Sequence, residues 1–418
     1  MPSTPESIPP VHKNIWYVHP YAGGPGIGRF SRAFYLAQNW RLQSIRTTIL
    51  SPTFHHLMDA PQAPGEKRID DVSYHFIEAR AYPNNGLARL LNMADFSFGL
   101  LRDADRLVAR YGVPDAIIGS SPHPYMFLAV HRLAKRYDAI SIFEVRDLWP
   151  LSLVELADVS PYHPLVIGTG WVERYAYRHA DHVVSLHPAS RTYMCERGAD
   201  ADRWHYIPNG VDAQEEAVVE PDEPAYRRLM QWHQEGMFVA LYAGALGPPN
   251  NIDILVRAAA ELRSRGNDRI RILVVGRGEM QQQIAGMVSD LGLEERVAIY
   301  PQVPKSHAIG LMQKADVGYI SLKPKPIFMH GVSPNKLHDY MLAKLPIVSA
   351  MRVGNDSVTE AGCGLTVEPG DPVAVAEAFI RLADMDRTEL REMGERGLTF
   401  VRRHHDYAAL ARIYAELF

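Results

Sequence analysis

The chain has few cysteines. Cys195 and Cys363 are the two among 418 residues, and they stand far apart without CxxC spacing, which excludes a disulfide scaffold and gives no sign of a zinc site. A formal net charge of -4 provides no basic field for nucleic acid. No apolar run approaches the ~20 residues that span a bilayer, and the start lacks the blocks of a signal peptide. We therefore expect a cytoplasmic protein whose membrane contact, at the inner face, is at most peripheral.

Length and composition predict two globular domains. With 418 residues, 47% hydrophobic and 22% charged, each half can bury a full core. Short apolar runs alternate with helical stretches, which is typical of parallel strands covered by helices on both faces. The runs begin at Ile15, Asp115, Ile140 and His182, and again at Phe238, Ile270, Arg296, Asp316 and Pro346. The sequence thus predicts the α/β class with two Rossmann-like parallel-sheet domains.

The turn signal in Ile207–Asp212 and the acidic stretch over residues 215–226 predict the joint between the domains. We expect an N-terminal domain over residues 1–212, a linker over 213–236, a C-terminal domain over 237–400 and a C-terminal helix over 401–418. The apolar face expected for that helix consists of Tyr407, Leu410, Ile413 and Leu417. The helix either crosses back to the first domain or docks on its own.

The run SPNKLHDYMLAKLPIV, residues 333–348, joins a helix start, a cation and a carboxylate. Ser333 is expected to cap the helix and Pro334 to suit its first turn, so that backbone N–H groups such as that of Asn335 point at an anion. Lys336 adds a full positive charge, and a diphosphate can be neutralised there without a metal. One turn on, Asp339 can accept hydrogen bonds from ribose hydroxyls. The run predicts a nucleotide-diphosphate site, with an ordinary capped helix as the alternative.

Glycine-rich turns follow several predicted strands. In the second half, Gly244 and Gly247 follow one strand and Arg277 follows the next, at the sheet edge where α/β proteins bind ligands. We expect these turns to surround the nucleotide, although packing alone can explain glycines. In the first half, Gly24, Gly26 and Gly28 lead through Arg29 into a helix. Their spacing is neither GxGxxG nor a Walker loop, and this loop is either a phosphate- or acceptor-facing loop or a tight turn without function.

Two further polar segments end strands in the first half. Arg146 and Asp147 lie in EVRDLWP and are candidate catalytic residues that orient the acceptor, while a structural salt bridge with a core Trp is the alternative. His123 lies in SSPHPYM and is a candidate acceptor or phosphate contact, or a polar filler. The stretch from Leu87 to Arg110 is basic and amphipathic, which suits either anionic lipid or a sheet-covering helix. The Asp-x-Asp triplets follow no strand, so we expect no metal and no cofactor.

These motifs occur in the order found in retaining family 4 glycosyltransferases. The chain resembles most closely the bacterial WbuB-like polysaccharide and lipopolysaccharide enzymes, which share the RDLWP and SPNK segments. The resemblance implies the GT-B architecture, with two Rossmann-like domains facing across a cleft, the nucleotide sugar on the second and the acceptor on the first. It places the ribose-binding carboxylate on Asp339. It places the phosphate-facing helix start on Pro334, Asn335 and Lys336.

In the second half, the chain departs from the family pattern at three positions, and in the first half Arg146 stands where many members have a His. The other carboxylate of the Glu-x7-Glu pattern falls at Gly331, and the usual Arg and Lys of the diphosphate clamp fall near Ala245 and Asn250. Lys336, with Arg277 or Arg29, is then expected to neutralise the diphosphate. The resemblance implies a peripheral, metal-independent, retaining transferase of hexosyltransferase type. A UDP-sugar, such as an N-acetylated hexosamine or deoxyhexosamine, is the expected donor and a hydroxyl of a surface glycan or lipid-linked glycan the acceptor. A nucleotide-sugar epimerase and a catalytically silent nucleotide-sugar-binding protein are the alternatives.

Overall fold

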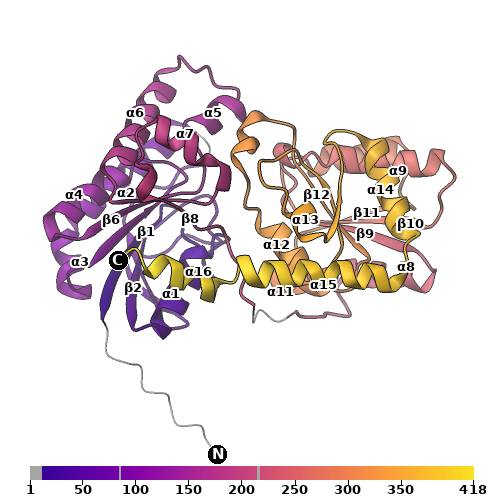
Figure 1. Ribbon diagram of the computed structural model, residues 1–418, viewed down its shortest axis with the longest axis horizontal. Coiled ribbons are helices and arrows are strands. Elements are labelled where there is room, and N and C mark those ends of the chain that lie inside the picture. Colours follow the sequence, from indigo (N-terminus) through magenta and orange to yellow (C-terminus); the bar gives the residue numbers. More distant parts are fainter. Residues whose placement is uncertain (1–11, 84–85, 214–216) are drawn as a thin grey trace, which may run out of the picture. The chain divides into compact units, whose positions relative to one another are not determined.

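The computed structural model describes residues 12–83, 86–213 and 217–418, which form two compact units (Figure 1). Unit 1 contains Met1–Asn209 and Tyr407–Phe418, and unit 2 contains Gly210–Asp406. The expected linker over residues 213–236 differs from this division. Its described part contains helix α8 (Pro224–Gln234), whose Leu229 and Trp232 are buried in the core of unit 2. Part of the expected linker is therefore an element of the second unit.

Unit 1 is built on an eight-stranded sheet in the order β3-β4-β2-β1-β5-β6-β7-β8. The described pairs are parallel except for the antiparallel edge pair β3–β4. The strands are β1 (Lys13–Val18), β2 (Ile45–Pro52), β3 (Gly65–Ile69), β4 (Val72–Ile77), β5 (Ala116–Ser120), β6 (Ile140–Val145), β7 (His182–Ser185) and β8 (Trp204–Tyr206). Strands β1, β5 and β6 are central neighbours, so the loops that follow them share one sheet edge.

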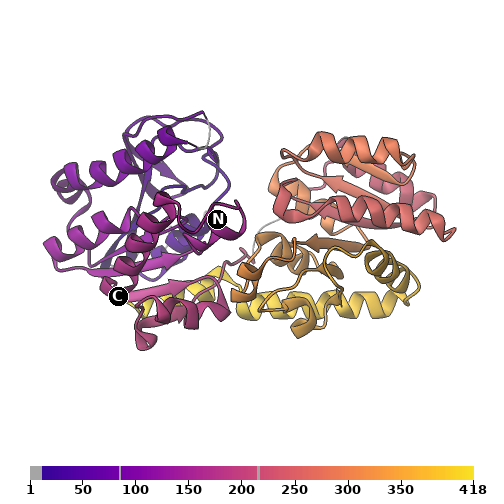
Figure 2. The same cartoon turned by 90° about the horizontal axis from the view of Figure 1, so that it is seen from above.

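Helices cover both faces of this sheet (Figure 2). They are α1 (Arg32–Leu42), α2 (Leu87–Arg102), α3 (Ala104–Tyr111), α4 (Phe127–Tyr137), α5 (Leu151–Glu155), α6 (Pro164–His179), α7 (Arg191–Glu196), the short turns η1 (Pro188–Ser190) and η2 (Ala201–Arg203), and α16 (Tyr407–Ala415). The stretch from Leu87 to Arg110 thus forms two helices. Some apolar residues of this stretch face solvent: Leu87 and Phe98 are 72% and 71% exposed.

The C-terminal helix α16 belongs to unit 1 and packs against α1. The indole N–H of Trp40 donates to the carbonyl of Ala411 at 2.9 Å, and the rings of Tyr35 and Tyr407 stack at 5.1 Å. The predicted apolar face is wrong in one residue. Ile413 is 49% exposed, whereas Tyr414 is fully buried, because the helix turns its aromatic side toward Trp40.

Unit 2 is built on a six-stranded parallel sheet in the order β11-β10-β9-β12-β13-β14. The strands are β9 (Phe238–Ala243), β10 (Ile270–Val275), β11 (Val297–Tyr300), β12 (Val317–Ser321), β13 (Ile347–Ala350) and β14 (Gly364–Thr366). On one face lie α9 (Asp253–Ser264), α10 (Gln281–Asp290) and α14 (Pro372–Ala383). On the other lie α8, α11 (Lys305–Met312), α12 (Asn335–Leu342) and α15 (Arg387–His404). The shorter elements are η3 (Pro248–Asn250), η4 (Pro326–His330) and α13 (Ser357–Ala361).

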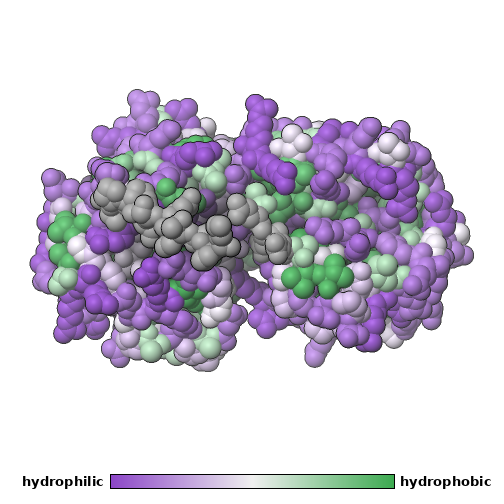
Figure 3. Space-filling view, turned by 90° about the horizontal axis from the view of Figure 1, so that it is seen from below, coloured by the Kyte–Doolittle hydropathy of each residue, from purple (hydrophilic) through white to green (hydrophobic). Residues whose placement is uncertain are grey.

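The surface is as hydrophilic as the composition of a globular protein predicts. One face of the molecule is mostly hydrophilic, with hydrophobic residues in separate small patches (Figure 3). Within the described ranges, no helix is both long and apolar enough to cross a membrane. Cys195 and Cys363 are both free thiols.

Candidate active site

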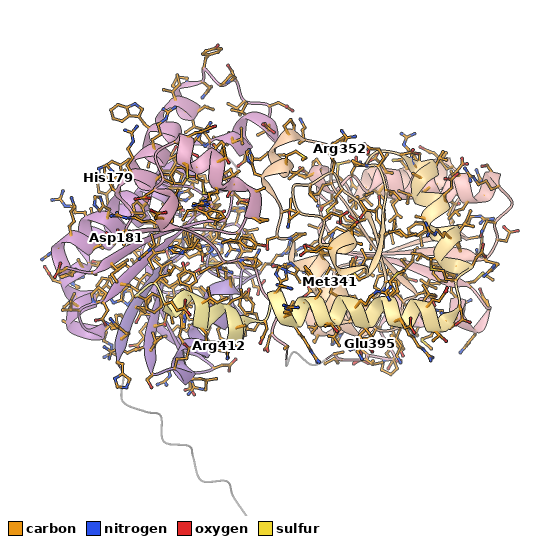
Figure 4. The ribbon with its side chains drawn as sticks, in the orientation of Figure 1. His179, Asp181, Met341, Arg352, Glu395 and Arg412 are labelled. Atoms are coloured by element: carbon orange, nitrogen blue, oxygen red, sulfur yellow. The ribbon has the colours of Figure 1, made fainter. Side chains whose placement is uncertain are left out.

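The start of helix α12 lies at the carboxyl edge of the unit 2 sheet and is held there by Tyr340. The buried Tyr340 hydroxyl accepts the backbone N–H of Ala243 at 3.0 Å and lies 3.2 Å from the carbonyl oxygen of Tyr319. These contacts tie the helix to the ends of β9 and β12. On its other side α12 packs closely on α15, where a Cβ at Gly397 would lie 3.5 Å from Cγ of Met341 (Figure 4). The helix start is therefore fixed rigidly.

Lys336 passes directly over the turn that follows β9. Its ammonium lies 3.6 Å from the centroid of the Tyr242 ring, a distance at which the ring attracts a cation. Its side chain fills the space above Gly244, where a Cβ would lie only 2.4 Å from Lys336 Cε. Within the described parts of the chain, no carboxylate forms an ion pair with this ammonium. Burial lowers the pKa of Lys336 to about 7, because a partly buried cation loses hydration that nothing here replaces.

The cap predicted for α12 is wrong in detail. The helix begins at Asn335, and Pro334 itself occupies the N-cap position with an extended backbone and no side-chain cap hydrogen bond. Ser333 therefore lies one residue before the cap. Since proline has no hydroxyl or carboxylate to offer, its side chain caps none of the first backbone N–H groups of the helix. The missing cap favours an anion site more than the predicted serine cap would.

Asp339 lies beside Lys336 on α12 but is not a solitary carboxylate. Its side chain is 13% exposed and lies 3.6 Å from the ammonium of Lys305, at the start of α11. This contact, which the sequence did not indicate, joins α12 to the loop that follows β11. The Lys305 side chain is 43% exposed, so the pair lies at the surface of unit 2 and contributes little to stability.

The glycines in the turns of unit 2 have mainly packing roles. A Cβ at Gly276 would lie 1.9 Å from the Gly244 carbonyl oxygen, and one at Gly278 would lie 2.3 Å from that of Leu246. These two residues, which were not singled out in the sequence, let the turns after β9 and β10 lie against each other. Gly247 has ordinary contacts, the nearest at 3.8 Å. Arg277 is exposed at the end of β10, where its guanidinium can reach a ligand.

The loop before α12 explains the missing carboxylate at Gly331. Its backbone has a φ of 98°, a conformation that strains any residue with a Cβ. The side-chain amide of Asn355 holds the next residue through two hydrogen bonds with the backbone of Val332, at 2.7 and 2.8 Å. Asn355 thus holds the loop before α12 in place.

Replacement of Gly244 by alanine tests the contact with Lys336. The added Cβ would lie 2.4 Å from Lys336 Cε and 2.9 Å from Nζ, at a φ of +156°, so the lysine must move away. If Lys336 binds a diphosphate, calorimetry should show UDP affinity lower by about tenfold, the effect of about 1.4 kcal/mol. Gly286→Ala is the matched control, because that site on α10 has open space around it. Equal UDP affinity in the two variants would contradict the contact's role.

The glycine loop of unit 1 is largely explained by packing. A Cβ at Gly24 would lie 2.4 Å from the Tyr74 hydroxyl, and one at Gly28 would lie 2.4 Å from the Leu57 carbonyl oxygen. Gly26 and Arg29 are exposed. The helix expected from Arg29 begins at Arg32, because the residues before it form a bridge between Gly24 and Gly28. The structure thus favours the tight turn for the glycines.

A buried ion pair lies beneath the candidate residues of unit 1. The guanidinium of Arg32 donates to the Glu144 carboxylate at 3.0 Å and to the Ile207 carbonyl at 3.0 Å. The hydroxyls of Tyr17 and Ser120 donate to the same carboxylate, at 2.5 and 2.7 Å. Burial pushes the pKa of Glu144 upward, but Arg32, Arg146 and the hydroxyls more than offset it and lower the pKa. The buried ion pair at this strand end is therefore that of Glu144 with Arg32, whereas the alternative interpretation of EVRDLWP expected a salt bridge at Arg146 and Asp147.

The candidates that remain in unit 1 lie above this pair. Arg146 is held by a hydrogen bond from its backbone N–H to the Ser121 hydroxyl at 2.9 Å, and its guanidinium lies 5.1 Å from the Phe30 ring. Asp147 is exposed. His123 is fully buried, with its ring 5.9 Å from that of Tyr21. The described residues contain no group of three or more His, Cys, Asp or Glu arranged to hold a metal ion.

Comparison with known families agrees with this architecture. Residues 27–210 match the family described as "Glycosyl transferase 4-like domain", and residues 238–385 match "Glycosyl transferases group 1". The chain therefore carries both of the domains that these two family models describe. The first match covers most of unit 1, and the second covers the β9–β14 sheet with Gly244, Lys336 and Asp339.

Two curated relatives of this chain are D-inositol 3-phosphate glycosyltransferases. The protein of Acidothermus cellulolyticus is 29% identical over 198 residues, which are 45% of this chain and 42% of that protein. The protein of Catenulispora acidiphila is 25% identical over 321 residues, 73% of this chain and 70% of that protein. The chain thus spans less than half the length of the first relative and about two thirds of the second.

Solved structures show the same GT-B fold over nearly the whole chain. Sucrose-phosphate synthase from Thermosynechococcus elongatus has a TM-score of 0.75 at 17% identity and covers 97% of this chain and 98% of its own. Alr3699/HepE of Anabaena, in complex with UDP and glucose, has a TM-score of 0.67 at 16% identity and covers 97% of this chain and 99% of its own. At these identities the likeness is one of fold.

Proposed function

We propose that this chain is a retaining, metal-independent glycosyltransferase that moves a sugar from UDP to a hydroxyl of a bacterial surface-glycan acceptor, as in the WbuB-like branch. The donor is assigned to the carboxyl edge of the unit 2 sheet and the acceptor to that of unit 1. The two family matches and the UDP bound to a neighbour of the same fold support this assignment. The acceptor class and the retention of configuration follow from the resemblance of the RDLWP and SPNK segments.

The observation that carries the proposal is the uncompensated ammonium of Lys336 at the start of α12. A partly buried cation without an ion-pair partner destabilises the free protein, and such groups gather at functional sites. The diphosphate of a nucleotide supplies the missing negative charge. The backbone N–H groups at Asn335 and Lys336 add hydrogen bonds to it. As the glycosidic bond breaks, charge grows on the departing diphosphate, and these donors stabilise it without reorganising.

Neighbouring groups complete the donor site. Asp339 is placed to accept hydrogen bonds from the ribose hydroxyls, and the ammonium of Lys305 lies 3.6 Å from its carboxylate. Arg277 at the end of β10 is a second cation for the diphosphate. On unit 1, Arg146 and Asp147 orient the acceptor. No step in this scheme needs a metal, so addition of EDTA should leave the rate unchanged.

A panel of UDP-, GDP- and dTDP-sugars tests the proposal through thermal stabilisation, because a ligand that binds only the folded state raises Tm. We expect UDP-sugars to raise Tm most and to release UDP slowly in the absence of acceptor. An isomerised sugar without released UDP would identify an epimerase instead. Binding with neither product would identify a silent binding protein, and binding of no nucleotide would contradict the proposal.

The affinity for UDP should fall with rising pH. Burial holds the pKa of Lys336 at about 7 in the free protein, and a bound diphosphate raises it, so binding takes up a proton above that pH. Calorimetry should show affinity falling by up to about tenfold per pH unit above about pH 7. The Lys336→Met variant should lose this slope. A flat profile in the wild type would contradict a role for the ammonium.

A further inference from the structure

Several side chains of unit 1 have buried polar atoms for which no hydrogen bond is found, and three of these side chains follow neighbouring strands. In these three, the atoms are Nη1 of Arg146, Nε2 of His19 and both ring nitrogens of His123. His19 and His123 are 0% exposed. The three residues follow β1, β5 and β6, which are neighbouring strands, so they meet at one sheet edge. Buried polar groups in native proteins are nearly always paired, and a cluster of exceptions needs a reason.

The unpaired atom of His19 is a donor. Its Nδ1 accepts the backbone N–H of Tyr21 at 2.9 Å, so in the neutral ring the proton resides on Nε2. The ring is neutral because burial, together with the neighbouring cations, lowers the pKa of His19 well below its usual value. Burial likewise lowers the pKa of His123 to about 3, and its neutral ring has one N–H. Two neutral N–H donors and one guanidinium N–H thus share this edge.

Aromatic rings hold these donors together. The Phe30 ring lies 6.4 Å from the ring of His19 and 5.1 Å from Cζ of Arg146. The Tyr21 ring lies 5.9 Å from the ring of His123. Arg89 donates to the Tyr21 hydroxyl at 2.8 Å, which places another cation beside the same ring. Each of the three donor side chains thus lies beside the ring of Phe30 or of Tyr21.

The charge of Arg146 is not balanced within this set. The adjacent carboxylate, Asp147, forms no ion pair with Arg146, and Glu144, two residues before, is already in an ion pair with Arg32 at 3.0 Å. Among the described residues no carboxylate forms an ion pair with Arg146. A neutral hydroxyl of a sugar would satisfy one N–H but would leave the guanidinium charge uncompensated. An oxyanion satisfies both, because its oxygens accept several hydrogen bonds and its charge balances the guanidinium.

We propose that unit 1 binds an anionic group of the acceptor, a phosphate or a carboxylate, through Arg146, His19 and His123. This inference rests on the proposed function, which assigns the acceptor to unit 1. It adds a charge requirement: acceptors that carry the anionic group near the receiving hydroxyl bind, and their neutral counterparts do not. Arg146 is then a binding residue for the acceptor.

The test is a titration of the full chain with anions while UDP saturates the donor site. Calorimetry with methyl phosphate, inorganic phosphate and acetate should show binding of at least one, and methanol should show none. Arg146→Gln should weaken that binding by at least about tenfold, the effect of losing one charge-assisted contact. Arg106→Gln, at an arginine on α3 whose side chain is 89% exposed, should leave it unchanged. Phosphate binding without acetate binding would identify a phosphate acceptor, and the reverse a carboxylate.

Other outcomes separate the two proposals. If UDP binds but no anion does, the acceptor inference is overturned while the donor site stands. If anions bind equally to the wild type and to Arg146→Gln, they are adventitious ions only, and the inference is overturned too. If UDP itself fails to bind, the proposed function fails. Should Arg146→Gln not fold, as judged by circular dichroism, His123→Asn replaces it with the same expected loss.

Discussion

Replacement of Lys336 by methionine is expected to lower the rate of UDP release from a UDP-sugar by about 100-fold or more, the usual effect of removing one preorganised donor from developing negative charge. Methionine keeps the length and the apolar contacts over Gly244 and Tyr242 but removes the ammonium. UDP affinity should fall as well, because the ground-state diphosphate already carries charge. The rate is measured by coupled detection of UDP, and Lys314→Met, at an exposed lysine of unit 2, is the matched control.

The same substitution should not destabilise the free protein, which separates loss of function from misfolding. The folded pKa of Lys336 is about 7, against an ordinary value of 10.5. Between these values the unfolded chain binds more protons, so wild-type stability rises with pH over this window. Below pH 7, the charged and desolvated ammonium of Lys336 lowers the stability of the folded protein. We expect Lys336→Met to melt at the same temperature or higher near pH 7 and to lack the rise. A clearly lower Tm would indicate that the lysine is structural.

Replacement of Glu144 by alanine is expected to have the largest effect on stability. The variant leaves the guanidinium of Arg32, whose side chain is 1% exposed, buried without a carboxylate. Breaking a buried pair from one side typically destabilises by about 3–5 kcal/mol. The same change removes the acceptor for Tyr17 and Ser120. Urea unfolding measures the free energy of unfolding, and Glu416→Ala, at an exposed residue that follows α16, should change it little.

The pH dependence of stability supplies a second check on Glu144. Its pKa is lower in the folded protein than its ordinary value, so its contribution is present above the unfolded pKa, about 4.3. It is lost as pH falls through the folded value. The Glu144→Ala variant should therefore show a weaker loss of stability on acidification than the wild type. Identical acid profiles would contradict the pair's role, even if Tm differed.

Much of the fold could be predicted because its signals are local. Continuous apolar runs marked β1, β5, β6 and β7, and all the strands of unit 2 except β14. The predicted runs do not include β2, β3, β4 or β8. The edge strand β3 is exposed along most of its length, and its pattern is polar. The sequence does not decide whether the C-terminal helix returns to the first domain, because the packing of α16 on α1 joins residues 371 positions apart.

In the candidate site, too, the residues with local signals could be predicted and the contacts between distant residues could not. Lys336, Gly244 and Asp339 follow from residue types next to predicted strand and helix ends, and the structure brings Lys336 and Gly244 into contact. What the sequence could not give are pairings between distant residues: Lys336 with the Tyr242 ring, Arg32 with Glu144 and Asp339 with Lys305. His19 was also missed, because a lone histidine at a strand end carries no signal until its unpaired nitrogen is seen in three dimensions.

The central claim is that Lys336 recognises the diphosphate. The most direct test compares how the loss of this lysine changes the binding of ligands with and without phosphate groups. Affinities of UDP, UMP and uridine are measured by calorimetry for the wild type and Lys336→Met. The account predicts that methionine reduces UDP binding by about tenfold or more, a coupling of at least about 1.4 kcal/mol, while uridine binding stays the same. Equal losses for UDP and uridine, or none for either, would contradict it.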